Sequence, residues 1–122
     1  MPRAMVVDDS RAVRLILSRT LAEMGFEAIQ AGNGREAFEA LQRYDPVVFA
    51  LVDWNMPEVN GLEFVRRVRA CPAFSGVRLI MVTTETESEQ ITLALEAGAD
   101  EYVMKPFTRE MVEDKLRLIG II

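Results

Sequence analysis

The chain alternates short apolar runs with longer amphipathic stretches, and one apolar run, residues 47–52, has no polar interruption. It ends at Asp53. A run this short and this uniformly apolar predicts a β-strand buried on both faces, as in a parallel sheet with helices on either side. Pro57 prevents this strand from continuing through the interior of a sheet.

Four further short apolar runs predict the other strands, at residues 4–7, 27–31, 79–82 and 101–104. The polar residue Gln30 lies inside the second of these five strands, which favours a position at an edge of the sheet. The first, third and fourth strands are the most apolar, so we expect them to be central. The fifth strand is then a candidate for the other edge.

Between the strands, apolar residues recur at a spacing of three and four residues, which predicts amphipathic helices. Five helices are expected to begin near Ser10, Asn33, Asn60, Thr86 and Thr108. Three of these starts have capping-box spacing, completed by Glu36, Glu63 and Glu89. The strict alternation of strands and helices predicts an α/β fold with a parallel sheet and right-handed crossovers. We expect the doubly wound strand order 2-1-3-4-5, with helices on both faces.

Composition limits the class of protein. A chain of 122 residues, half of them hydrophobic, suffices for one domain with its own core. Cys71 is the only cysteine and there is no histidine, which excludes an intrachain disulfide and argues against structural zinc. The net charge of −5 argues against nucleic-acid binding. No run is long enough to span a membrane and no signal peptide is evident, so we expect a cytoplasmic protein.

Acidic residues follow two of the central strands. Asp8 and Asp9 come after the first strand, as Asp53 comes after the third. In the expected strand order these two strands are neighbours, and the crevice at their carboxyl ends is where such folds bind ligands. Three adjacent carboxylates repel one another unless one is protonated or a cation neutralises them. Oxygen ligands without histidine or cysteine select Mg²⁺ or Mn²⁺.

Thr83 and Lys105 end the fourth and fifth strands and can reach the same crevice. Carboxylates, a metal ion, an ammonium group and a hydroxyl together suit a transferring phosphoryl group, with Asp53 as nucleophile. Each residue alone also has a purely structural explanation: Asp8 and Asp9 can cap a helix, and Lys105 can belong to a turn. Their shared location at carboxyl ends of strands favours a functional site.

Six segments of the chain resemble the receiver domain of two-component response regulators, and most closely the single-domain chemotaxis regulators of the CheY type. They are VDDS at 7–10, DWNMP at 53–57, NG at 60–61, VT at 82–83, GA at 98–99 and YVMKPF at 102–107. The resemblance covers essentially the whole chain. It implies a single receiver domain over residues 1–122 with a flavodoxin-like fold.

The resemblance also implies a role for each site residue. Asp53 would accept a phosphoryl group from a histidine kinase. Asp9 and Asp53 would bind Mg²⁺ directly, together with the backbone carbonyl of Asn55, and Asp8 would act through water. Lys105 would pair with the phosphoryl group. An X-Pro bond is cis in only about 5–6% of cases, but here the resemblance implies a cis bond after Lys105, which would aim its side chain into the crevice.

Other residues would transmit and time the signal. In the family, Thr83 would move to bond the phosphoryl group and Tyr102 would turn inward behind it. Asn55 and Glu85 occupy the positions that tune dephosphorylation. Thr84, beside Thr83, is often a smaller residue in relatives, and its bulk bears on the freedom of Thr83 and Tyr102.

The implied function is a signalling switch whose catalysis is confined to its own phosphorylation and dephosphorylation. A target protein would read the face made by the fourth helix, fifth strand and fifth helix of a monomer, in chemotaxis or flagellar motor control. One alternative is the receiver part of a transcription factor, although the chain ends at Ile122, soon after the last helix. Another is an aspartyl-phosphate phosphatase of the haloacid-dehalogenase type. Asn55 argues against it, because an amide cannot act as the general acid.

Overall fold

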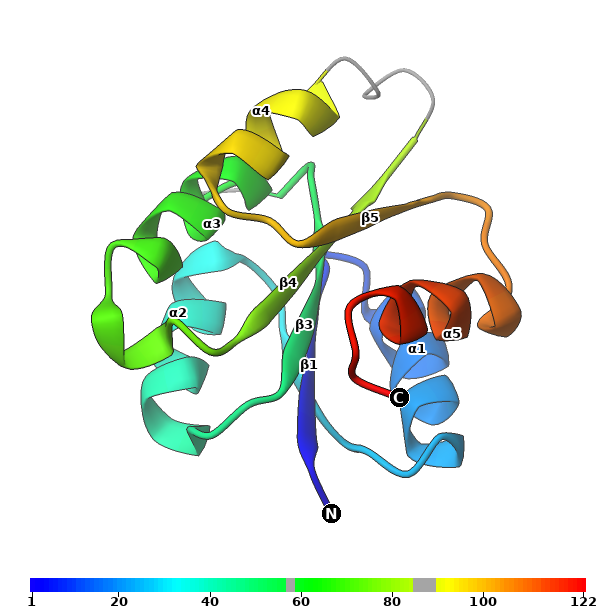
Figure 1. The fold of residues 1–122 in the computed structure, drawn as a ribbon. Coiled ribbons are helices and arrows are strands. Elements are labelled where there is room, and N and C mark those ends of the chain that lie inside the picture. Colours follow the sequence, from blue (N-terminus) through cyan, green and yellow to red (C-terminus); the bar gives the residue numbers. More distant parts are fainter. Residues whose placement is uncertain (57–58, 85–89) are drawn as a thin grey trace.

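A computed structural model describes residues 1–56, 59–84 and 90–122 of the chain. Five strands form one parallel sheet in the order β2-β1-β3-β4-β5, as the apolar pattern predicts (Figure 1). Their bounds are β1 (Arg3–Val7), β2 (Glu27–Ala31), β3 (Phe49–Asp53), β4 (Arg78–Thr83) and β5 (Glu101–Met104). The interpretation of Gln30 as a sign of an edge strand is confirmed, because β2 pairs only with β1 among the described strands.

Helices cover both faces of the sheet, with α2, α3 and α4 on one side and α1 and α5 on the other (Figure 1). Their bounds are α1 (Arg11–Glu23), α2 (Gly34–Tyr44), α3 (Gly61–Arg69), α4 (Ile91–Ala97) and α5 (Arg109–Leu118). Each face has its own apolar core, one centred on Val52 and Phe64 and the other on Leu51 and Leu116. The alternation of β3 side chains between these cores explains why that strand is apolar throughout.

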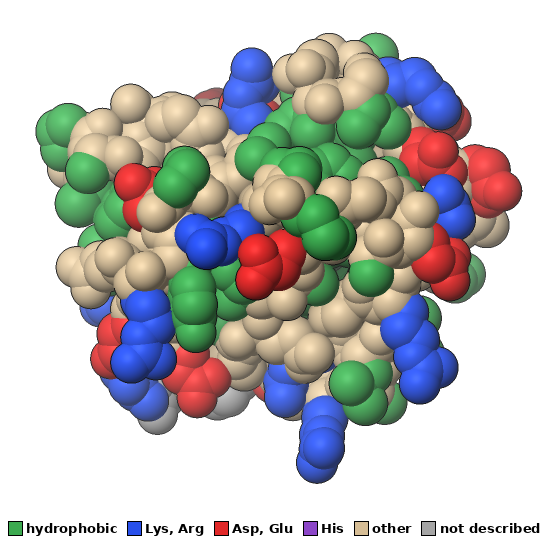
Figure 2. Space-filling view, turned by 90° about the horizontal axis from the view of Figure 1, so that it is seen from below, with side chains coloured by type: hydrophobic (Ala, Val, Ile, Leu, Met, Phe, Trp, Pro, Cys, Tyr) green, Lys and Arg blue, Asp and Glu red, His purple; other side chains and the backbone are tan. Residues whose placement is uncertain are grey.

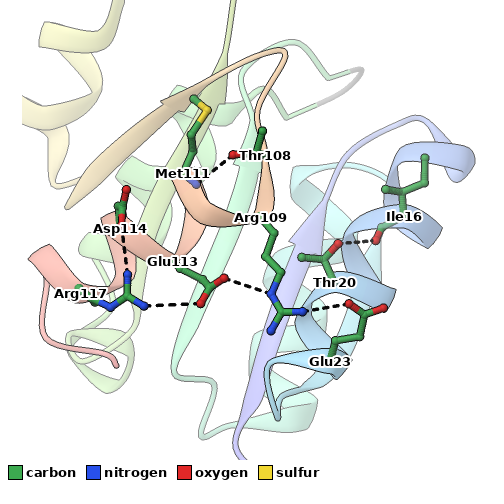
Figure 3. Close-up of polar contacts among 9 residues, drawn as sticks. All are labelled: Ile16, Thr20, Glu23, Thr108, Arg109, Met111, Glu113, Asp114 and Arg117. Carbon is green, nitrogen blue, oxygen red and sulfur yellow. Dashed lines mark hydrogen bonds and ion pairs between the residues drawn. The ribbon is translucent and has the colours of Figure 1, made fainter.

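Four of the five expected helix starts can be checked, and in all four a side chain caps the helix. Asn33 and Asn60 accept hydrogen bonds from the backbone N–H groups of Glu36 and Glu63. Ser10 caps α1 in the same way. Thr108 caps α5 by accepting from Met111 N at 3.3 Å (Figure 3). The expected capping box of Thr86 and Glu89 lies outside the described residues, as does Pro57.

Strand bounds differ from expectation mainly at β3. The apolar run begins at Val47, but the strand begins at Phe49 and includes Asp53. Val47 is buried in the core but does not join the ladder, so its apolar character reflects burial and not strand pairing. A short 3-10 helix, η1 (Pro72–Phe74), was not predicted. None of the helices in the described parts of the chain is both long and apolar enough to cross a membrane.

The loops that follow β5 and α2 each contain a cis peptide bond. The bond between Lys105 and Pro106 is cis, as the resemblance implied. The bond between Asp45 and Pro46 is also cis, and nothing in the sequence pattern indicated it.

The face seen from below the sheet carries charged side chains of both signs. Figure 2 shows Lys and Arg interspersed with Asp and Glu on this face, with apolar patches between them. Charges of the two signs are therefore mixed on this face of the described residues.

Candidate functional site

Acidic side chains from two neighbouring strand ends converge at the carboxyl edge of the sheet. Asp8 follows β1 directly and Asp53 is the last residue of β3. Carboxylate oxygens of Asp8, Asp9 and Asp53 lie within 4.8 Å of one another. Asp8 and Asp53 are buried and Asp9 is exposed. The spatial cluster predicted from the strand order is therefore present.

Backbone contacts hold Asp8 in place. Its carboxylate Oδ1 accepts the N–H of Ser10 at 2.8 Å, which also turns the chain into α1. Its carbonyl oxygen accepts Nη1 of Arg14 at 2.7 Å, one turn into that helix. The sequence indicated Ser10 as a helix start and within the VDDS segment, but not as a contact of Asp8, and it did not indicate Arg14. A long side chain that returns to the backbone carries no periodic signal in the sequence.

Lys105 supplies the positive charge facing the acids. Its Nζ lies 3.5 Å from Asp53 Oδ1 and 3.6 Å from Asp8 Oδ2. Its backbone N–H donates to the Thr83 carbonyl at 2.7 Å, so the loop that carries it is tied to the end of β4. One ammonium group is thus shared between the two buried carboxylates of the cluster.

The carboxyl group of Asp53 is electrostatically unusual. Burial, with the neighbouring charge of Asp8, raises the pKa of Asp53 from 3.8 to about 6, although Lys105 acts in the opposite direction. Because burial and Asp8 disfavour the ionised form of Asp53, a cation bound beside it would stabilise that form. Strongly perturbed groups in a crevice are candidates for a functional role.

A close backbone approach shapes the site behind Asp53. Gly61, the first residue of α3, donates its N–H to the Trp54 carbonyl at 3.1 Å. A Cβ at residue 61 would lie 2.8 Å from the Asp53 carbonyl oxygen and 2.8 Å from Met81 Cε. Only glycine allows α3 to begin this close to the strand end that presents the carboxylate.

The other described candidate residues lie on β4, on β5 and in the segment after β3. Thr83 ends β4 and is buried, and its Oγ1 donates to the Thr84 carbonyl at 3.2 Å. Tyr102 pairs with Met81 across the β4–β5 ladder and is partly buried at the edge of the sheet. Asn55 is exposed two residues beyond Asp53. Glu85 lies outside the described residues.

Comparison with known proteins agrees with this geometry. The family description "Response regulator receiver domain" matches residues 4–117. The chain belongs to the response regulator receiver family. Chemotaxis protein CheY1 of Helicobacter pylori strain J99 is 40% identical over 118 residues, 96% of this chain and 95% of that protein. A CheY homologue of Campylobacter jejuni is 41% identical over 115 residues, 93% of this chain and 88% of that protein.

Solved structures agree on the receiver fold. The crystallised chemotaxis response regulator CheY4 of Vibrio cholerae has a TM-score of 0.89 and 34% identity, and the match covers 98% of both chains. A receiver-domain protein from Clostridium thermocellum, at 20% identity, has a TM-score of 0.88. The flavodoxin-like receiver architecture is thus shared at identities that range from 20% to 34%.

Receiver domains generally bind Mg²⁺ at an acidic site, and the donor set of this receiver domain fits that ion. All three candidate side-chain ligands are carboxylates, the hard oxygen donors that Mg²⁺ prefers. Oxygens on one octahedral Mg²⁺ lie within about 4.2 Å of one another. A spread of 4.8 Å therefore needs only a small closing movement. The exposure of Asp9 leaves the cluster open to water, which Mg²⁺ retains in part.

Proposed function

We propose that residues 1–122 form one receiver domain that accepts a phosphoryl group on Asp53 from a histidine kinase. Phosphorylation then changes its affinity for a target protein. The observation that carries the proposal is the meeting of Asp8, Asp9 and Asp53, at the ends of β1 and β3, with Lys105 from the loop after β5. Whole-chain similarity to CheY proteins of 40–41% identity supports a role in chemotaxis.

Asp53 is the group suited to nucleophilic attack. Its carboxylate oxygen attacks phosphorus, the bond from phosphorus to the imidazole nitrogen of the kinase breaks, and that nitrogen leaves with the electron pair. Lys105 Nζ lies 3.5 Å from Asp53 Oδ1 and can pair with the transferred group. The ammonium group is already in place, so little reorganisation is needed when negative charge arrives.

The proposed ligands of Mg²⁺ are Asp9, Asp53 and the backbone carbonyl of Asn55, with Asp8 acting through water. When bound, the ion neutralises charge on the phosphoryl oxygens. Asp8 suits a water-mediated role because Ser10 N–H occupies its Oδ1 and Lys105 Nζ lies near its Oδ2. Asp9 is exposed. Asn55 also belongs with Glu85 to the pair proposed to set the lifetime of the phosphorylated form.

Magnesium binding can be measured through Trp54, the only tryptophan, which directly follows Asp53. Titration with Mg²⁺ should give a saturable fluorescence change. Asp8→Ala should weaken binding by about tenfold, as loss of an outer-shell partner does, and Asp9→Ala should weaken it more because a direct ligand is lost. Asp114→Ala, at an exposed position on α5, is the matched control. A linear, non-saturable response of the wild-type protein would exclude the site.

The proposed output is a change on the side of the sheet where α4, β5 and α5 meet (Figure 1). Apolar side chains are exposed there, including Leu93 and Leu95 on α4 and Met111 on α5. Exposed apolar side chains that gather on one surface are typical of protein interfaces. Thr83 and Tyr102 lie on adjacent strands between Asp53 and this side. A move of Thr83 toward the phosphoryl group would leave space for the Tyr102 ring, whose phenol combines an apolar body with a polar tip.

Thr83→Ala tests this coupling. The variant should still accept a phosphoryl group or beryllofluoride at Asp53, because Thr83 is not the acceptor. The shift changes that beryllofluoride and Mg²⁺ cause at Tyr102, Ile91 and Met111 should fall to near zero, with NMR as the measurement. If these residues do not respond in the wild-type protein while Asp53 and Lys105 do, the chain binds phosphoryl mimics but is not this switch.

A further inference from the structure

A lysine of α5 contacts Tyr102 in a way that the sequence pattern did not indicate. Lys115 Nζ lies 4.5 Å from the centroid of the Tyr102 ring. A cation this close to an aromatic ring is attracted to the negative face of its π-system. Lys115 belongs to α5 and Tyr102 to β5, so the contact joins two elements of the proposed output face.

Glu101 fixes the position of this lysine. Lys115 Nζ lies 3.2 Å from Glu101 Oε1, and the same oxygen accepts the backbone N–H of Tyr102 at 3.0 Å. The side chains of Lys115 and Glu101 are 26% and 20% exposed, so solvent screens this pair less than a surface ion pair. The ammonium group is thereby held beside the ring by a carboxylate that is itself tied to the backbone of β5.

The contact between Lys115 and Tyr102 occurs together with a Thr83 side chain that is hydrogen-bonded to the next residue. Here Thr83 Oγ1 donates to the Thr84 carbonyl, so its proton is directed at the following loop. Under the proposed function Thr83 must turn toward the phosphoryl group before the Tyr102 ring moves inward. That movement separates the ring from Lys115, which stays paired with Glu101, and the cation–π contact is lost.

We propose that Lys115 is a positioning residue that holds Tyr102 in the arrangement described here and thereby opposes switching. This inference rests on the proposed function, since it assigns the regulation of the same tyrosine. Two populations that differ by a few kcal/mol are shifted by any contact made in only one of them. A cation–π contact at a partly buried position shifts such an equilibrium by about fivefold.

Three variants of α5 test the role of Lys115. Lys115→Gln removes the charge but can still donate to Glu101, and Lys115→Arg retains the charge. Arg117→Gln removes one positive charge from the same helix, where Arg117 pairs with Glu113 and Asp114 instead of Tyr102 (Figure 3). Each variant is titrated with beryllofluoride at saturating Mg²⁺. Trp54 fluorescence reports occupancy at Asp53, and NMR reports the Tyr102 ring.

Lys115→Gln should reach half-saturation at an approximately fivefold lower beryllofluoride concentration than the wild-type protein. Before any addition, its Tyr102 ring signals should already have moved toward their saturated positions. Lys115→Arg and Arg117→Gln should match the wild-type protein in both measurements. These variants separate the ring contact from a general effect of charge on α5.

The possible failures are distinguishable. If the wild-type Tyr102 ring responds to beryllofluoride but Lys115→Gln titrates like wild type, the role of Lys115 is wrong and the proposed switch stands. If Arg117→Gln reproduces the effect, net charge on α5 explains it and the role of Lys115 is again wrong. If the wild-type ring does not respond although Trp54 reports binding, the proposed switch itself is wrong, and the inference is overturned with it.

Discussion

The Asp53→Asn variant is expected to unfold at a higher denaturant concentration than the wild-type protein at pH 7.5 without divalent ions. Burial and Asp8 raise the pKa of Asp53 to about 6, so its ionised form destabilises the fold. The rise from 3.8 corresponds to about 3 kcal/mol, at roughly 1.4 kcal/mol per pKa unit. Two effects reduce this figure. Solvent at the exposed Asp9 screens the charges of the cluster, and the substitution removes the Asp53 charge that pairs with Lys105. We therefore expect a gain of about 1–3 kcal/mol.

The pH dependence of this gain follows from the direction of the pKa shift. A carboxyl group whose pKa is higher in the folded state stabilises the fold fully below its unfolded value of 3.8. That contribution is lost as the pH rises through about 6. The difference between Asp53→Asn and the wild-type protein should therefore be small at pH 4, grow between pH 4 and 6, and be constant at higher pH.

Denaturant unfolding from pH 4 to 8 measures this difference, with Asp9→Asn as the matched control. Asp9 contributes the same charge to the cluster but is exposed, so its replacement should change the free energy of unfolding by less than about 0.5 kcal/mol. Added Mg²⁺ should stabilise the wild-type protein by binding the folded state and should have little effect on Asp53→Asn. An Asp53→Asn protein less stable than wild type at pH 7.5 would contradict the account of Asp53 as a buried, costly charge.

The strand order could be predicted because the burial of a strand determines how many of its residues are apolar. Residues buried on both faces, as in β3, must be apolar throughout, and Gln30 is tolerated only where β2 has an open edge. The ends of strands are less visible. Val47 is apolar because it is buried, not because it pairs, and the hydrophobic pattern does not separate the two.

The acidic cluster could be predicted for a related reason: strand ends in this topology converge on one edge, and charged residues stand out there against apolar runs. The supporting contacts could not. The backbone N–H of Ser10 donates to the Asp8 carboxylate, and the Arg14 side chain donates to the Asp8 carbonyl. Gly61 contributes because it has no Cβ, which leaves room for the Asp53 carbonyl. Such contacts depend on three-dimensional closeness and leave no periodic pattern, although the family resemblance did include Ser10 and Gly61.

Arg69 is a second residue whose importance only the structure makes visible. Its guanidinium group donates to the carbonyl oxygens of Gly98, Phe74 and Val77 at 2.9, 3.2 and 2.7 Å. It also donates to Asp100 Oδ2 at 2.9 Å. That oxygen accepts the backbone N–H of Leu79 as well, at 2.8 Å. One side chain therefore joins the end of α3 to η1, to β4 and to the connection between α4 and β5.

Gly98 shows how closely this arginine is packed. The backbone there has a φ of +121°, which favours glycine, and a Cβ would lie 2.5 Å from Arg69 Cγ. The family resemblance included Gly98 without giving a structural reason for it. Its absence of a side chain also makes room for the stem of Arg69. Arg69 thus holds the segment that leads into β5, the strand that carries Tyr102. This segment precedes β5, whereas Lys105 of the acidic site follows it.

The Arg69→Met variant should lower the free energy of unfolding by about 2–3 kcal/mol. Methionine keeps the apolar stem but leaves three carbonyls and a partly buried carboxylate without this donor. Arg67→Met is the matched control, since Arg67 forms an exposed pair with Glu63 on the same helix, and pairs of this kind contribute about 0.3–0.5 kcal/mol. Equal effects of the two substitutions in denaturant unfolding would mean that Arg69 is only another surface charge. A selective loss at Arg69 would identify it as the residue that joins the end of α3 to η1 and to the connection between α4 and β5.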